Sequence, residues 1–247
     1  MDFLHNLAKV TKELNGLSVV KALNRAIRKI SACTHHFQHI IEWETAPPPP
    51  PEWYDHFLNQ HWNWAGGMPW ERGFFSALAL KKGGRALELC CGDGFNAHNF
   101  YADHLSKIVA VDFDELAIKH AKKNFVNPKI SYEVCDIRTS LPSGLFDNII
   151  WDGAIEHFTE AEIAKLIANI KKCLTRDGIL SGYTIVEKPD GTKSHHEHEY
   201  EFSSKEDLKR FFSPHFKRVQ IFETFSSDRH NLYFYASNRT HLPLDSD

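Results

Sequence analysis

Hydrophobic and polar positions change their period several times along this chain. From residue 85 onward, short apolar runs alternate with stretches in which apolar residues recur at helical spacing. The predicted strands are at residues 85–90, 107–111, 130–134, 146–151, 179–186, 219–224 and 232–236, and the predicted helices at 95–103, 114–124, 159–173 and 205–212. Strand–helix alternation of this kind predicts an α/β fold with a mostly parallel sheet and helices on both faces.

Local signals indicate where several of these elements begin and how they pair. Thr159-x-x-Glu162 and Ser203-x-x-Glu206 have the spacing of capping boxes and predict two helix N-termini. The last two strands are separated by a short loop and should pair antiparallel. The predicted inner face of helix 114–124 comprises Leu116, Ala117, His120 and Ala121.

Residues 1–46 are predicted to form an N-terminal helical extension. One face is apolar (Val19, Val20, Leu23, Ala26, Ile27, Ile30) and the other is basic (Lys21, Arg25, Arg28, Lys29). Such a helix packs on a core or on a second subunit, and its basic side leaves peripheral membrane contact open as an alternative. The proline run at 47–51 predicts a stiff spacer of about 15 Å and a domain boundary. A docking site for an SH3-like module is the weaker interpretation of that run.

Composition narrows the class of protein. The 247 residues carry a net charge of −3, so no basic surface for sequence-independent nucleic-acid binding is indicated. The five cysteines are odd in number and lack a CxxC spacing, which favours reduced thiols in a cytoplasmic protein. The sequence shows neither a signal-peptide pattern nor an apolar run of about 18 residues that could span a bilayer.

The stretch at 85–97 is the main candidate for chemistry. A short apolar strand ends in a turn containing Gly92 and Gly94, and a helix follows. Glycines permit positive φ angles and let a ligand approach the backbone, and the turn delivers that ligand to a helix N-terminus. We therefore expect the functional site at this turn.

Two cofactor classes use such a turn. Gly92-x-Gly94-x-x-Ala97, with Asp112 about 20 residues on, satisfies the dinucleotide pattern of an NAD-dependent oxidoreductase. However, Glu88 lies within the first strand and Asp93 within the turn. Acidic groups suit S-adenosylmethionine better, because it carries an ammonium and a sulfonium, and Asp112 could accept hydrogen bonds from its ribose diol.

Residues 88–96, Glu-Leu-Cys-Cys-Gly-Asp-Gly-Phe-Asn, resemble the first motif of class I S-adenosylmethionine-dependent methyltransferases. The resemblance continues through residues 109–117, 135–138, 146–152 and 174–180, and covers roughly 70–238. It implies a Rossmann-like, seven-stranded, mostly parallel sheet with an antiparallel last strand, in a catalytic domain at 76–240 followed by a tail at 241–247. Cys90 stands where the family usually has its first glycine, and we expect its backbone to keep an ordinary φ.

The resemblance also implies cofactor contacts. Asp112 would bind the ribose, and Glu88 would orient the amino end of the methionine part. Phe113, Asp136 and the backbone N–H of Ile137 would contact the adenine. The full set of predicted cofactor residues is Glu88, Cys90, Gly92, Gly94, Asp112, Phe113, Asp136, Ile137 and Asp152, with Trp70 and Arg72 from the preceding segment.

That preceding segment, residues 52–75, contains four of the six tryptophans. In the family, the segment before the first strand covers the cofactor, so we expect a shaped lid here. Arg72 could hold a carboxylate in a bidentate pair. The alternative is that these aromatic residues only fill the gap between lid and sheet.

Candidate acid–base residues lie in three places: His157 of the Glu156-His157 pair, His195 and His198 of the His195-His-Glu-His-Glu199 patch, and His230. The patch is open to three interpretations: a solvated loop, a general base or substrate contact, and a metal site. Its spacing matches no common metal motif, so we assign no metal from the sequence.

The leading hypothesis is a methyltransferase acting on a small molecule, with a sugar hydroxyl or a lipid-linked intermediate as acceptor. A hydroxyl acceptor needs a base, and a neutral histidine suits that role. Protein or nucleic-acid methylation, an NAD-dependent oxidoreductase and a non-catalytic scaffold are the alternatives. The segment after the fourth strand begins Trp151-Asp-Gly-Ala154 and lacks an Asn-Pro-Pro-Tyr-like signature, which weakens the case for planar amino acceptors.

Overall fold

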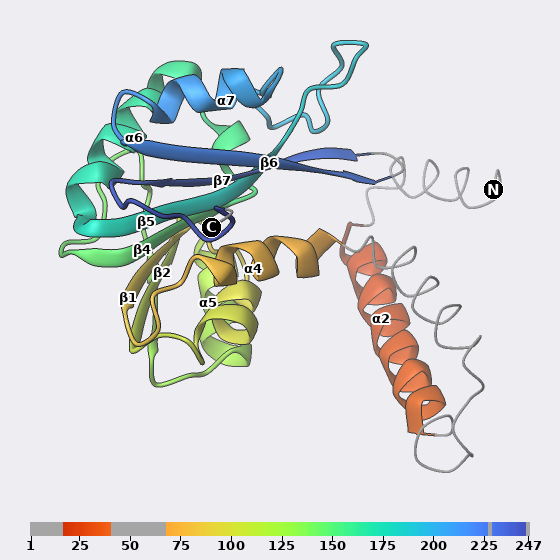
Figure 1. Cartoon of the computed structure of the whole chain (residues 1–247). Coiled ribbons are helices and arrows are strands. Elements are labelled where there is room, and N and C mark those ends of the chain that lie inside the picture. The colour runs from red at the N-terminus through yellow and green to blue at the C-terminus, as the bar shows by residue number, and fades with distance from the viewer. Residues whose placement is uncertain (1–16, 41–67, 227–228, 246–247) are drawn as a thin grey trace, which may run out of the picture. The chain divides into compact units, whose positions relative to one another are not determined.

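The computed structural model describes residues 17–40, 68–226 and 229–245. The chain divides after Gly66 into two units, with helix α2 (Leu17–Ile40) in the first and every other described element in the second (Figure 1). The predicted proline spacer at 47–51 and most of the predicted lid lie outside the described residues. These two predictions therefore stay predictions.

Helix α2 agrees with the amphipathic pattern expected for the N-terminal extension. Leu23, Ile27 and Ile30 each keep more than half of their surface exposed. None of the helices within the described ranges is both long and apolar enough to cross a bilayer. Membrane contact or self-association through this helix stays a prediction.

The second unit contains a seven-stranded sheet with the strand order β3-β2-β1-β4-β5-β7-β6 (Figure 1). The strands are β1 (Arg85–Leu89), β2 (Lys107–Asp112), β3 (Ile130–Val134), β4 (Phe146–Asp152), β5 (Leu174–Ile185), β6 (Arg218–Ser226) and β7 (Arg229–Ser237). Strand β7 runs antiparallel to both of its neighbours, and the other neighbouring pairs are parallel. The predicted fold class is thus confirmed, although β5 begins at Leu174 rather than at residue 179.

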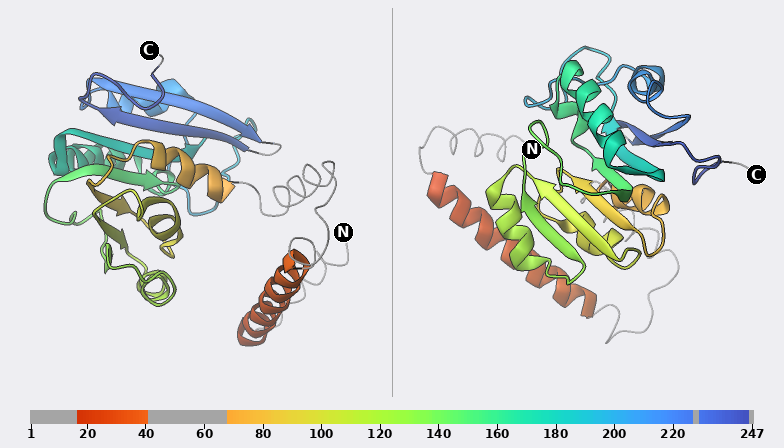
Figure 2. Two further views of the ribbon diagram at one scale, coloured as in Figure 1. Left: turned by 60° about the horizontal axis from the view of Figure 1, so that its bottom comes forward. Right: turned by 90° about the vertical axis from the view of Figure 1, so that its left-hand side faces the viewer.

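Helices cover both faces of this sheet (Figures 1 and 2). Helices α6 (Glu160–Cys173) and α7 (Lys205–Phe212) bury apolar residues on one face, together with side chains of β1, β4, β5 and β7. The other face carries α4 (Met68–Leu78), the π-turn η2 (Ala97–Tyr101) and α5 (Glu115–Asn124). Burial of apolar surface on both faces accounts for the near-continuous hydrophobic character of the central strands.

The helix N-termini agree only partly with the sequence signals. Thr159 and Glu162 form the predicted capping box of α6. Helix α7 is capped instead by Ser204, whose side chain accepts a hydrogen bond from the Asp207 N–H, so the predicted box starting at Ser203 is wrong.

The inner face of α5 also differs from the prediction. Ile118 and Ala121 are buried, whereas Leu116 is 76% exposed and His120 is exposed. Helical spacing alone allows two adjacent inner faces, one containing Leu116 and the other containing Ile118. Packing against the sheet buries the face that contains Ile118.

Helix α4 overlaps the predicted lid segment, and it packs against η2 and the sheet within the second unit. A Cβ added at Gly73 would lie 2.2 Å from a ring carbon of Phe100, so the helix approaches η2 closely there. Phe75 contacts the ring of Tyr233 at a centroid distance of 4.7 Å, and its carbonyl accepts a hydrogen bond from the Tyr235 hydroxyl. The side chains of Trp70 and Arg72, in the first turns of α4, lie outside the described part of the structure.

Candidate active site

Four neighbouring parallel strands end around one cavity of about 760 Å³. Cys90 follows β1, Asp112 ends β2, Asp136 lies just beyond β3 and Gly153 follows β4, and all four line this first cavity. Ligands bind beyond the carboxyl ends of strands in open α/β sheets. The first cavity therefore occupies the position that the strand pattern predicts.

The backbone of the turn after β1 is left-handed at three positions. Gly92 and Gly94 have φ angles of 54° and 81°, as expected for glycines. Cys90 also has a φ of 54°, so the expectation of an ordinary φ at this position is wrong. A non-glycine residue pays about 1–2 kcal/mol for this conformation. Burial raises the pKa of the Cys90 thiol, which therefore stays protonated.

The two glycines of the turn serve different purposes. A Cβ at Gly94 would lie 2.7 Å from a ring carbon of Tyr132 and 2.8 Å from the Cβ of Ala121, so the turn packs tightly against β3 and α5. At Gly92 an added Cβ would meet no atom within 4 Å. Gly94 thus allows close packing, whereas Gly92 leaves open space beside the backbone.

Asp112 connects the turn after β1 to the end of β2. Its Oδ2 accepts a hydrogen bond from the Gly92 N–H at 2.9 Å, and its Oδ1 accepts one from the Asp114 N–H at 2.9 Å. A carboxylate oxygen has two lone pairs, so each oxygen can still accept a ligand hydroxyl. Phe113, the next residue, is 66% exposed and lines the first cavity with an uncovered ring.

The far side of the first cavity contains a residue that the sequence analysis missed. Arg138 lies beside the predicted Asp136 and buried Ile137, and its guanidinium is 5.0 Å from the centre of the Phe158 ring. Its Nε is 3.3 Å from Oε1 of Glu162. An Asp-x-Arg spacing after a strand does not by itself predict a cavity residue. The contacts of Arg138 with Phe158 and Glu162 depend on where α6 packs.

Glu88 and Asp152, both predicted cofactor contacts, lie outside the lining of the first cavity. Burial, followed by the nearby Asp152, Asp93 and Asp112, raises the pKa of the Glu88 carboxyl well above its usual value. Its Oε2 has no hydrogen-bond partner among the described residues.

Asp152 is held on the face of the sheet that α4 and η2 cover. Its carboxylate accepts hydrogen bonds from the Ser76 hydroxyl and the Tyr101 hydroxyl, both at 2.8 Å. Burial raises the pKa of Tyr101 well above its usual value, so this phenol remains a donor. The described contacts of Asp152 thus tie α4 and η2 to β4, and its predicted contact with the cofactor stays a prediction.

A second cavity, of about 400 Å³, adjoins the first. It shares Gly153 and His157 with the first cavity, because both residues line each of them. Its remaining lining residues are Glu156, Tyr183, Lys188, Ser194, His195, His198 and Arg229.

The histidine-rich loop folds onto the turn that follows β4. The backbone N–H groups of Glu199 and Tyr200 both donate to the Glu156 carbonyl, at 2.8 and 3.1 Å. The imidazole of His198 lies 4.8 Å from that of His157 and 5.5 Å from that of His195, between ring centres. The structure therefore brings together three of the four predicted acid–base residues.

His230, the fourth predicted acid–base residue, lies outside the lining of both cavities. Its Nε2 is 2.9 Å from Oε1 of Glu223, and its ring stacks on Phe225. Its predicted role as a base stays a prediction.

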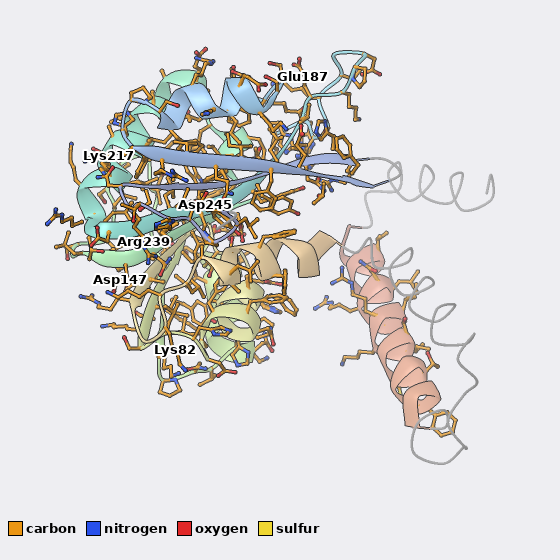
Figure 3. All side chains as sticks on the ribbon, viewed as in Figure 1. Lys82, Asp147, Glu187, Lys217, Arg239 and Asp245 are labelled. Atoms are coloured by element: carbon orange, nitrogen blue, oxygen red, sulfur yellow. The ribbon has the colours of Figure 1, made fainter. Side chains whose placement is uncertain are left out.

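A third cavity, of about 670 Å³, lies at the opposite ends of the strands from the first cavity. Asp147, Lys217 and Arg239 line it and gather at one end of the second unit, far from Glu187, which follows β5 at the other end (Figure 3). The amino ends of parallel strands lie there, away from the glycine turn.

Comparisons with known proteins agree with this geometry. Residues 86–178 match a family model described as a methyltransferase domain. An uncharacterized methyltransferase of Synechocystis sp. is 30% identical over 106 residues, which are 42% of this chain. The chain spans about half (48%) of that relative's length.

Two solved structures share the fold at low sequence identity. The N-methyltransferase NodS from Bradyrhizobium japonicum WM9, in complex with S-adenosyl-L-homocysteine, is 18% identical, with a TM-score of 0.54 over 66% of this chain and 82% of that one. A methyltransferase-like protein from Bacillus halodurans C-125 is 15% identical, with a TM-score of 0.55 over 67% of this chain and 97% of that one.

The family-model match over residues 86–178 and the fold shared with these solved structures support a class I S-adenosylmethionine-dependent methyltransferase domain. The antiparallel β7, inserted between β5 and β6, departs from the strand order 3-2-1-4-5-6 of dinucleotide-binding domains, which argues against the NAD alternative.

S-adenosylmethionine is the cofactor of this class, and the residues present fit it. The space at Gly92 is open, the Phe113 ring is uncovered, and Glu88 contributes a buried oxygen without a partner to a strongly acidic neighbourhood.

Proposed function

We propose that this chain transfers the methyl group of S-adenosylmethionine to a hydroxyl of a small molecule held in the second cavity. The observation that carries the proposal is the contiguity of the two cavities through Gly153 and His157. Methyl transfer is a direct displacement that needs donor and acceptor about 3–3.5 Å apart and in line. Two adjoining cavities that share two lining residues suit such an arrangement.

The first cavity is assigned to the methyl donor. Asp112 would accept the ribose hydroxyls, Phe113 would lie against the adenine, and Asp136 would accept from its amino group. Arg138 and Glu162 close the adenine end by their ion pair. When bound, S-adenosylmethionine supplies an activated methyl group on a sulfonium, and departure of the neutral thioether requires no proton.

The charged side chains of the second cavity support an anionic acceptor. Lys188 and Arg229 supply positive charge, and the Tyr183 hydroxyl receives a hydrogen bond from Arg229 Nη2 at 3.3 Å. These cations favour an acceptor with an anionic group near the hydroxyl. A phosphorylated sugar or a lipid-linked sugar intermediate has both features.

His195 is the candidate base for such a hydroxyl. It lines the second cavity, and its side chain is 48% exposed, so it can pass a proton to solvent. With a sugar hydroxyl as acceptor, His195→Ala should lower kcat far more than it changes KM.

The proposal is tested by incubating the protein with methyl-labelled S-adenosylmethionine and separate metabolite, protein and RNA fractions. Label should enter an anionic small molecule, and Arg229→Ala should raise KM for it more than it lowers kcat. Label confined to protein or RNA would refute the small-molecule assignment. Label in no fraction, with cofactor binding intact, would favour the non-catalytic alternative.

A further inference from the structure

Three potential metal-binding side chains converge where the histidine-rich loop covers the turn after β4. One ligand atom from each of Glu156, His157 and His198 lies within 4.8 Å of the other two. Glu156 is 4% exposed and His198 7% exposed. Glu156 and His157 belong to the short helix η3 (Ile155–His157), whereas His198 comes from a loop about 40 residues further along the chain. The cluster is therefore created by tertiary folding.

We propose that Glu156, His157 and His198 bind a divalent transition-metal ion of the zinc type. Two imidazoles and one carboxylate form a donor set that zinc, manganese and other first-row metals use, with positions left open for a further ligand. Hard ions such as magnesium prefer oxygen ligands, and this set is mainly nitrogen.

The atoms behind the three ligands support this proposal. Nδ1 of His198 is 2.5 Å from Oε1 of Glu201, and Nδ1 of His157 is 3.3 Å from the Glu197 carbonyl oxygen. Oε2 of Glu156 accepts a hydrogen bond from the Thr184 hydroxyl at 3.0 Å. Metal-binding histidines characteristically hold a carboxylate or a backbone carbonyl with their second ring nitrogen. Both histidines here have that arrangement, which assigns Nε2 as the coordinating atom.

The spacing is close to what an ion requires. Zinc–nitrogen bonds are about 2.1 Å long, so two donors of one tetrahedral ion are about 3.4 Å apart. The ligand atoms lie within 4.8 Å of one another, roughly 1.4 Å more than this, so the three side chains must draw together by about that distance when the ion binds.

The position of the proposed ion connects it with the proposed function. His157 lines both cavities, and Glu156 and His198 line the second. An ion there could polarise an acceptor hydroxyl as a Lewis acid and lower its pKa. His157 and His198 would then be ligands, and His195 would remain as the base. This consequence rests on the proposed function, whereas metal binding itself does not.

The experiment titrates zinc into chelator-treated, full-length protein by calorimetry, and cobalt by visible absorption. We expect one zinc per chain at this site, with magnesium unable to compete. His198→Asn and Glu156→Gln should abolish this binding, and Glu201→Gln should weaken it about 10- to 100-fold. His196→Asn is the matched control, because the His196 side chain is 82% exposed and His196 is not one of the three ligands, and it should bind as the parent does.

Three results would overturn the proposal: no zinc binding, equal binding by His198→Asn, or a cobalt spectrum with thiolate charge-transfer bands, which would assign the metal to cysteines. Circular dichroism and S-adenosyl-L-homocysteine binding check the fold of His198→Asn, since His198 does not line the first cavity. If zinc binds as expected but no acceptor is ever methylated, the proposed function fails and the metal site stands.

Discussion

Alanine substitutions at Gly94, Gly92 and Gly191 separate packing, backbone strain and ligand access. All three residues have positive φ angles, so each alanine pays about 1–2 kcal/mol for the left-handed conformation. At Gly94 the new Cβ would also lie 2.7 Å from Tyr132 and 2.8 Å from Ala121, and overpacking of this kind costs about 1–3 kcal/mol more. At Gly92 and Gly191 the Cβ would meet nothing within 4 Å. We therefore expect a loss of about 2–5 kcal/mol at Gly94 and about 1–2 kcal/mol at the other two.

Thermal unfolding measures these costs, and calorimetry with S-adenosyl-L-homocysteine measures their effect on the site. One kcal/mol lowers Tm by about 2–4 °C in a domain of this size, so Gly94→Ala should melt about 4–20 °C below the parent. Gly92→Ala and Gly191→Ala should melt alike, but only Gly92→Ala should bind the ligand more weakly, because its methyl group enters the open space at the turn. If Gly94→Ala had the same Tm as Gly191→Ala, the packing argument would be refuted. If Gly92→Ala kept full affinity, the turn would not contact the cofactor.

Three further predictions concern other parts of the chain. At Cys90, glycine should be more stable than alanine by about 1–2 kcal/mol, because only glycine adopts a φ of 54° without strain; equal unfolding free energies for the two variants would contradict this. The pKa of Glu88 is raised in the folded state, so above pH 4.5 this group ionises in the unfolded chain first, and its contribution to stability falls as pH rises. Glu88→Gln should therefore stabilise the protein more at about pH 8 than at about pH 5, as measured by denaturant titration. A difference in unfolding free energy that does not change with pH would refute the assignment. Replacing Ile27 and Ile30 by aspartate should abolish self-association or binding to anionic vesicles, measured by light scattering and flotation; the prediction is wrong if the unmodified protein does neither.

The sheet was predictable because strands β1, β2 and β4 are mainly apolar and each leads into an aspartate or a glycine turn. Burial on both faces leaves no other role for such runs, and strand–helix alternation then dictates parallel pairing. The boundaries were less predictable. Strand β5 starts at Leu174 because Leu174 pairs with Phe146 across an irregular register that includes polar and glycine positions, which periodicity alone does not reveal.

The position of a site residue was predictable where it depends only on the end of one strand, as for Asp112 and Asp136, which both line the first cavity. It was not predictable where two distant segments must meet. Asp152 ends its strand like the others, but its carboxylate accepts hydrogen bonds from Ser76 and Tyr101. Likewise, the convergence of His198 with Glu156 and His157 depends on how a loop of irregular structure folds back, and local spacing contains no information on that path.

The most direct test of the account is calorimetric titration of S-adenosyl-L-homocysteine into the parent protein, Asp112→Asn and the control Asp103→Asn. Asp112 accepts the Gly92 N–H and is assigned to the ribose, so losing its charge should remove about 1.5–3 kcal/mol of binding free energy, roughly a 10- to 150-fold weaker Kd. Asp103 is exposed and does not line the first cavity, so its variant should bind as the parent does. One ligand per chain with this ranking is the predicted result. No binding by the parent, or equal affinity for Asp112→Asn and the parent, would contradict the account.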